Sequence, residues 1–189
     1  RVYLSSTNAG EITSTNSVIS ISLGYVTVAH STSGEMLVNI QSDVPRFGGI
    51  FLDQDDSPAP ALLTLSSTYQ KVASFTQNSL NSDSISDVSN NQLVLSQGVW
   101  DVSSNLSVSC SLGTTTYTLG IFLDGVLQPH LQSQHHIKDI GNSVTIPLSG
   151  HVYVSSGTKT LDVRIKVRSS DGTPDATFIY GALTTHRIS

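Results

Sequence analysis

The chain has 189 residues, of which 38% are hydrophobic and only 12% are charged, and its formal net charge is -5. This size allows one good hydrophobic core, or one core and a smaller module. The negative charge argues against a nucleic-acid-binding protein, because contacts with phosphates need a basic surface. Ser, Thr and Asn take the place of charged residues, a composition that suits β-sheet surfaces better than helices.

The chain shows no sign of membrane insertion, secretion or disulfide bonding. It has no apolar run of the length of a membrane span and no signal peptide. It begins at Arg1 rather than Met, so we expect a fragment or a processed product. Its single cysteine, Cys110, excludes an intrachain disulfide. Because Cys110 is in phase with Leu106 and Val108, we predict a small buried side chain rather than a catalytic thiol.

The first 50 residues have the pattern of a small β-module. In "SVISISLGY", apolar side chains occupy every second position from Ile19 to Tyr25. The segments "GYVTVAH" and "GEMLVNI" follow, and the turn signal "STSG" separates them. We predict a β-meander of about three strands here.

Residues 51–65 break the alternation and predict a linker. They hold an acidic run that begins at Asp53, followed by Pro58 and Pro60. The acidic run lacks the spacing and the glycine of a hand-type calcium loop, so we expect no calcium site. Part of the preceding segment is apolar (Phe47, Ile50, Phe51 and Leu52) and is able to pack.

Residues 66–189 return to alternation and predict a jelly-roll β-sandwich. The pair Asp124-Gly125 in "TYTLGIFLDGVLQP" is a strong hairpin signal. In "LDVRIKVR" the apolar residues point inward, and a basic stripe of Arg164, Lys166 and Arg168 points outward. About eight strands with glycine-rich turns in this stretch are typical of a jelly roll. The fold class is therefore all-β, with a jelly-roll head behind a small module.

Three segments of this region resemble the globular heads of tumour-necrosis-factor-like and complement-type proteins. They are "GVWDVSSNLSVS", "YTLGIFLDG" and the closing "ATFIYGALTTHRI". The resemblance implies a ten-stranded jelly roll that assembles as a homotrimer. It places Phe178, Tyr180 and Gly181 near the trimer axis.

The first 45 residues resemble small β-domains of tailed-phage virion proteins, including head-decoration proteins. The resemblance is carried by Leu23-Gly24-Tyr25-Val26, by Ala29, and by the stretch from Gly34 to Val38. Together with a trimeric head, it implies a spike, fibre or decoration protein located on the virion. The first strands of such a domain would lie upstream of Arg1.

The histidines of "HLQSQHHI" are the main candidates for chemistry. His130, His135 and His136 fall in a predicted loop, and zinc sites use nitrogen ligands at short spacings. However, no cysteine lies nearby, and adjacent histidines of an extended chain point to opposite faces. We predict no metal or other cofactor, and we assign the three histidines to a polar loop that contacts a receptor.

An enzyme is not predicted. The sequence has no G-x-S-x-G motif and no phosphate-binding glycine loop. Trp100 is able to stack on a sugar, but Val99 and Val102 beside it favour a core position. The basic stripe is able to meet an acidic partner, although such stripes are more often solvated.

These observations predict a phage virion structural protein whose homotrimeric spike or fibre head attaches to the host surface. The N-terminal module would bind other virion proteins, and polar loops of the head would contact a host glycan or protein. The alternative is a decoration protein that cements neighbouring capsid subunits. A polymer-degrading enzyme and a secreted trimeric signalling protein are further alternatives, and the N-terminal phrase disfavours the latter.

Overall fold

The computed structural model describes residues 2–4, 12–13, 22–29, 36–39, 46–53, 61–73, 75–78 and 85–188. The chain divides into two compact units, Arg1–Val44 and Pro45–Ser189. The predicted boundary at residue 50 is therefore six residues too late. Each unit is described by itself below.

The N-terminal unit contains a small antiparallel sheet. Its strands are β1 (Val2–Leu4), β2 (Ile12–Thr13), β3 (Ser22–Ala29) and β4 (Met36–Asn39), in the order β2-β1-β3-β4. Strand β3 pairs with β4 from Tyr25 opposite Asn39 to Ala29 opposite Met36. The predicted hairpin around "STSG" therefore has its two strands, although the turn itself and residues 17–21 lie outside the described residues.

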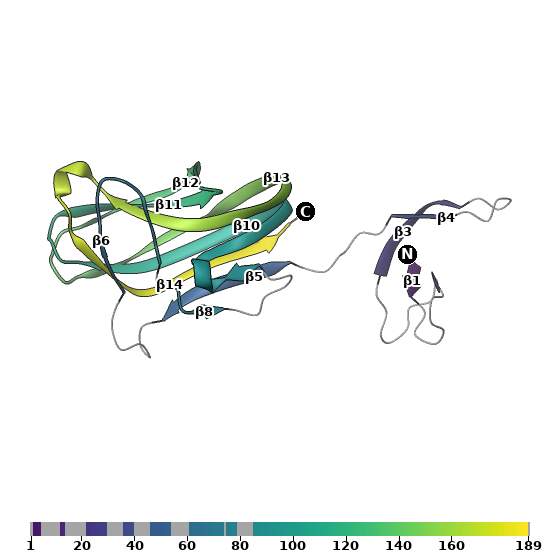
Figure 1. Ribbon diagram of the computed structural model, residues 1–189, viewed down its shortest axis with the longest axis horizontal. Coiled ribbons are helices and arrows are strands. Elements are labelled where there is room, and N and C mark those ends of the chain that lie inside the picture. The colour runs from purple at the N-terminus through teal and green to yellow at the C-terminus, as the bar shows by residue number, and fades with distance from the viewer. Residues whose placement is uncertain are drawn as a thin grey trace. The chain divides into compact units, whose positions relative to one another are not determined.

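In the residues of the C-terminal unit that the structure describes there are ten strands and two single turns of 3-10 helix; Figure 1 shows their arrangement. The strands are β5 (Phe47–Asp53), β6 (Ala61–Thr64), β7 (Gln70–Lys71), β8 (Gln77–Asn78), β9 (Ser86–Asp87), β10 (Gln92–Cys110), β11 (Thr115–Leu123), β12 (Val126–Ile137), β13 (Ser143–Val167) and β14 (Asp175–Arg187). The helical turns are η1 (Val88–Asn90) and η2 (Ser169–Asp171). The predicted all-β fold class is confirmed.

Two long strands, β10 and β13, belong to both halves of this antiparallel sheet, whose order is β12-β11-β13-β10-β14-β5-β8. Ser96 pairs with Thr158 but Gly98 pairs with Val154, so three residues of β13 stand opposite one residue of β10. Gly98 and Gly157 take positive φ angles of 144° and 65° at this irregularity, which residues with a side chain rarely adopt. The sheet folds over at this point into two layers (Figure 1).

The front layer consists of β5, β14, residues 98–109 of β10 and residues 143–154 of β13. The back layer consists of β12, β11 and the remaining parts of β10 and β13. Side chains from both layers form one core: Trp100 and Leu106 from the front and Tyr117 and Leu119 from the back are all 0% exposed. Each such side chain contributes about 1.5–3 kcal/mol by its burial.

Two single residues confirm predictions from the sequence. Trp100 lies in the core, and its indole Nε1 donates a hydrogen bond of 2.8 Å to the Ser96 carbonyl. Cys110 is buried as well, and its thiol lies 3.4 Å from Thr115 Oγ1. Neither side chain is placed to meet a ligand at the surface.

The predicted hairpin at Asp124-Gly125 is also confirmed, because β11 ends at Leu123 and β12 begins at Val126. Both turn residues have positive φ, 47° and 76°, as a type I′ turn requires. The Asp124 carboxylate accepts hydrogen bonds from Lys159 Nζ at 2.6 Å and from the Thr160 amide at 2.8 Å. The turn is thereby fixed to β13.

The prediction of a linker over residues 51–65 is wrong at both ends, where residues 51–53 belong to β5 and residues 61–64 belong to β6. Strand β5 pairs with β14 from Phe47 opposite His186 to Asp53 opposite Tyr180, and β6 pairs with β14 as well. Ile50 and Leu52 are 0% and 2% exposed. The alternation of Ile50 and Leu52 indicated the strand correctly, whereas the glycines, prolines and aspartates around them had indicated a linker. Residues 54–60, with most of the acidic run and both prolines, lie outside the described residues.

Candidate interaction face

The outer side of the front layer carries mainly short side chains. Trp100, Val102 and Leu106 of β10 point into the core, so their neighbours on the strand point outward. Strand pairing extends this face across β13 and β14. We call it the small-residue face, which consists of Ser103, Asn105, Ser107, Thr145, Pro147, Ser149, Ala182 and Thr184.

A cluster of one carboxylate and two imidazoles lies at one end of the small-residue face. Asp101 on β10 pairs with His151 on β13 and with His186 on β14. Asp101 Oδ1 is 3.7 Å from His151 Nε2, and Oδ2 is 3.6 Å from His186 Nδ1. All three side chains are partly or well exposed, and Asp101, Ser103, Thr184, Thr185 and His186 line a shallow depression.

The sequence analysis did not find this cluster. Each of its residues lies next to an inward-pointing residue of its own strand, but 35 to 85 residues separate the members in sequence. Only the register of three strands brings them together. The one sequence signal for the cluster was the outward phase of Asp101 in "GVWDVSS", and this phase does not show which residues of other strands lie beside Asp101.

Exposed apolar side chains lie around the face. Phe47, on β5 opposite His186, is 42% exposed, and Tyr153, on β13 two residues after His151, is 65% exposed. Tyr180 is 45% exposed and lies opposite Ser107, and Ile188 is 52% exposed. Exposed aromatic and apolar side chains on a surface with few charges are typical of a surface that binds another protein.

The structure places the three predicted axis residues differently. Tyr180 points outward, but Phe178 is 0% exposed, and a Cβ on Gly181 would lie 2.5 Å from Leu106 Cδ2 in the core. The reason is a bulge in β14: Val108 pairs with Phe178 while Ser107 pairs with Tyr180, so the inward phase changes there. Phe178 and Gly181 therefore face the core of their own chain, and the nearness of the three residues to a trimer axis stays a prediction.

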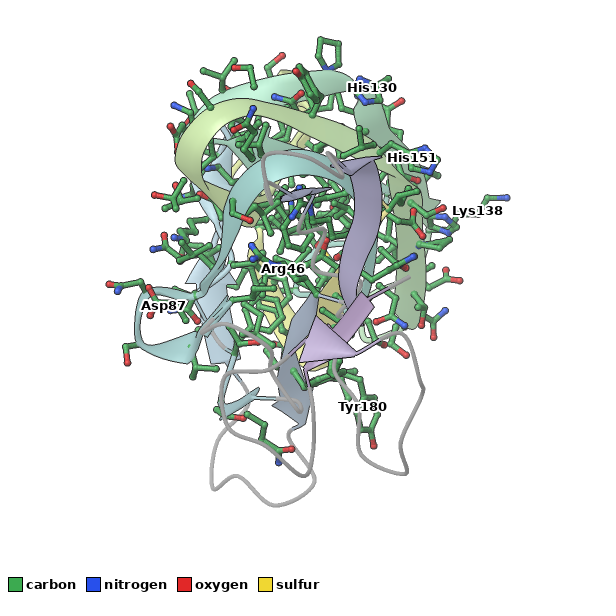
Figure 2. All side chains as sticks on the ribbon, turned by 90° about the vertical axis from the view of Figure 1, so that its right-hand side faces the viewer. Arg46, Asp87, His130, Lys138, His151 and Tyr180 are labelled. Carbon is green, nitrogen blue, oxygen red and sulfur yellow. The ribbon has the colours of Figure 1, made fainter. Side chains whose placement is uncertain are left out.

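The three histidines predicted in a receptor-contact loop lie on strand β12 instead. His135 pairs with Tyr117 and His136 with Thr116 of β11. His130 Nε2 lies 2.9 Å from the His151 carbonyl oxygen, and both residues are seen side by side in Figure 2, well away from Tyr180. Within the part of the chain that the structure describes, no three His, Cys, Asp or Glu side chains are arranged to hold a metal ion.

The side chains of the basic stripe, on the outer side of the back layer, contact other residues of the same unit. Arg164 donates to Asp162 at 2.7 Å, and its guanidinium lies 4.3 Å from the centre of the Phe122 ring. Lys166 lies 4.5 Å from the centre of the Tyr69 ring, which in turn packs edge-on against Phe122. The bond to Asp162 raises the pKa of Arg164. These cations have partners within their own unit.

No family model matches the chain, and no curated protein matches it. Among similar solved structures is the globular domain of zebrafish complement 1qA protein, which is 12% identical and has a TM-score of 0.44. The similarity covers 76% of this chain and 97% of that one. Among the described residues, no helix is both long enough and apolar enough to span a membrane.

Proposed function

We propose that this protein is a virion structural protein whose C-terminal unit, Pro45–Ser189, is a homotrimeric spike or fibre head that attaches to a host surface. The observation that carries the proposal is the small-residue face, an exposed sheet surface with short uncharged side chains and large apolar side chains around it. The proposal adds no catalytic role.

Short side chains favour self-association because they let identical flat sheets approach closely without ordering long flexible groups. In a closed ring of three copies, every chain buries its small-residue face, and no unpaired face is left to bind further copies. Obligate interfaces of this kind commonly bury more than about 2,000 Å². In such a ring the exposed Phe47, Tyr153 and Tyr180 would supply the large apolar contacts.

The virion assignment depends on the N-terminal unit. Most of the phrase that resembles phage virion domains falls on β3 and β4, whose backbones pair antiparallel, and residues 34–35 lie outside the described residues. In the proposal this unit binds other virion proteins, and the head contacts a host glycan or protein. The alternative, a capsid-cementing protein, would place most of the binding energy in Arg1–Val44.

The first test is the mass of the full chain in solution by light scattering at micromolar concentration. We expect about three times the 20.1 kDa of one chain. A variant with Asn105→Arg places a long cation on the small-residue face and should give monomers. Gln134→Arg makes the same change on the outer side of β12 and should leave the trimer intact. A wild-type monomer would overturn the proposal.

The second test separates attachment from cementing. A chain without residues 1–44 should still be trimeric and should compete with virions for host cells, because the head carries the contact groups. If the deleted chain loses competition, and the full chain raises the heat stability of capsids, the cementing alternative is correct instead.

A further inference from the structure

We propose that assembly of the head is linked to proton uptake by the cluster of Asp101, His151 and His186, so that trimers are tighter near pH 6 than near pH 8. The inference depends on the proposed trimer, because the cluster lies on the same side of the front layer as the small-residue face. It adds a regulation that the trimer alone does not imply.

The geometry places one carboxylate between two imidazoles on three adjacent strands. The distances of 3.6 and 3.7 Å are ion-pair distances, and each imidazole faces a different carboxylate oxygen. Asp101 is the only carboxylate among the described outward side chains of residues 101–107, 145–151 and 180–186. The charge at this end of the face therefore depends on the two histidines.

The other titratable and charged groups near the cluster come from the neighbouring strands. His130 on β12 lies 2.9 Å from the His151 carbonyl oxygen. Arg187 follows His186 on β14, and its amide donates to the carbonyl of Arg46, which precedes β5. Arg46 itself donates to Ser96 Oγ at 2.9 Å, and Tyr153 lies two residues after His151. His130 is the only imidazole among these groups.

The sign follows from the charge that is removed from water. With both imidazoles neutral, each chain brings an unbalanced carboxylate into the contact, and its desolvation and the repulsion between copies oppose assembly. One proton per chain makes the cluster neutral and gives Asp101 an ion-pair partner. A second proton makes the cluster positive, so assembly should weaken again.

The size of the effect follows from proton linkage. If each chain takes up one proton on assembly, the trimer association constant rises by about a thousandfold for each unit of falling pH. Partial uptake gives less. We therefore expect the midpoint concentration of assembly to fall at least about tenfold between pH 8 and pH 6.

The experiment is sedimentation of the full chain over a concentration series at pH 8, 7, 6 and 5. Asp101→Asn removes the carboxylate, so it should assemble at pH 8 about as tightly as the wild type does at pH 6 and should not assemble more tightly as the pH falls. The double variant His151→Gln with His186→Gln should stay as weak at pH 6 as the wild type is at pH 8. His135→Gln, an exposed histidine of β12 outside the cluster, should behave as the wild type.

The outcomes separate the two proposals. A wild type that is monomeric at every pH overturns the proposed trimer. A trimer whose midpoint concentration is the same at pH 6 and pH 8 overturns the proton linkage alone. Assembly of Asp101→Asn that still becomes tighter from pH 8 to pH 6 also overturns it, because another group must then carry the effect. Melting curves of all the variants show whether each remains folded.

Discussion

Ile146 and Ile140 lie six residues apart and have opposite surroundings. Ile146 on β13 is 0% exposed, whereas Ile140 in the turn before it is 68% exposed. Ile146→Ala should lower the free energy of unfolding by about 2–5 kcal/mol, because it leaves a cavity between the two layers. Ile140→Ala should change it by less than about 0.5 kcal/mol. Urea unfolding measures both, and equal losses would contradict the described core.

A glycine is required at position 181 by the packing of the core in the same chain, without any contact from a second subunit. A Cβ at this position would lie 2.5 Å from Leu106 Cδ2 and 3.4 Å from the Asn105 carbonyl oxygen. Gly181→Ala should therefore cost about 1–3 kcal/mol of stability.

A double-mutant cycle identifies the clash. Leu106→Ala removes the obstructing methyl group, so adding Gly181→Ala to it should cost much less than in the wild type. If the two losses are additive in urea unfolding, Leu106 is not the group that excludes a side chain at residue 181.

Single-residue environments were predictable from the sequence where they depend on strand phase alone. Trp100 and Cys110 share the inward phase of their strand, and both are buried as predicted. The inward positions of both Phe178 and Gly181 were not predictable, because a bulge changes the phase between them, and a bulge leaves no mark in the alternation. The pairing of Asp101 with two distant histidines depends on register, which local patterns do not contain.

At the scale of elements, the hairpin of β11 and β12 depends on the left-handed conformation of its two turn residues. Gly125 has φ 76°, and no other residue except Arg164 comes near the position of an added Cβ. Gly125→Ala should therefore cost about 1 kcal/mol for the backbone conformation alone. Gly125→Asn should cost less, since Asn tolerates positive φ, and a larger loss for Asn in thermal unfolding would contradict this explanation.

Helical turn η2 is joined to the start of β11 by one carboxylate. The Thr116 amide donates to Asp171 Oδ2 at 2.6 Å, and this bond, with smaller contributions from Ser170 and Arg168, lowers the pKa of Asp171. A carboxyl group whose pKa is lowered in the folded state stabilises that state at pH values above the ordinary pKa of about 3.9. The contribution is lost as the pH falls through the lowered value.

Asp171→Asn should therefore destabilise the protein by about 1 kcal/mol at pH 7. The difference from the wild type should shrink as the pH falls below about 4, because the carboxyl group of the unfolded wild-type chain then binds a proton that the folded state binds only at lower pH. Urea unfolding at pH 7, 5 and 3 provides the measurement. A difference that stays constant down to the lowest pH would show that the charge is not involved.

Most elements were predictable because alternation is a local signal, and the two errors have physical causes. Strand β5 holds Gly48 and Gly49 and precedes a segment rich in Asp and Pro, so turn residues concealed its inward Ile50 and Leu52. Strand β12 is polar at most exposed positions, with Leu131 and Ile137 as its buried anchors. An edge strand that contributes few side chains to the core resembles a loop in sequence.

At the scale of the molecule, the outer sides of the two layers differ in how the chain uses them. Tyr69 and Lys71 cover part of the back layer, where Tyr69 packs on Phe122 and Lys71 lies 3.8 Å from Asp162. The small-residue face of the front layer has no such cover among the described residues. A partner that binds the head is therefore expected at the front layer, which is why the proposed trimer uses that face.

The position of the unit boundary gives the last prediction. A chain of residues 45–189 keeps β5 and β6, and its melting temperature should lie within about 2 °C of the transition of the head in the full chain. A chain of residues 66–189 follows the boundary expected from the sequence and lacks both strands. It exposes one edge of β14 and loses the core side chains of Ile50, Leu52 and Leu65.

Each lost side chain costs about 2–5 kcal/mol, so the sum approaches or exceeds the 5–15 kcal/mol that usually stabilises a whole domain. The shorter chain should therefore be unfolded or aggregated at 25 °C, as circular dichroism and size-exclusion chromatography would show. If it folds cooperatively with the same melting temperature as residues 45–189, then β5 is an accessory strand and the boundary at residue 44 does not mark the folding unit.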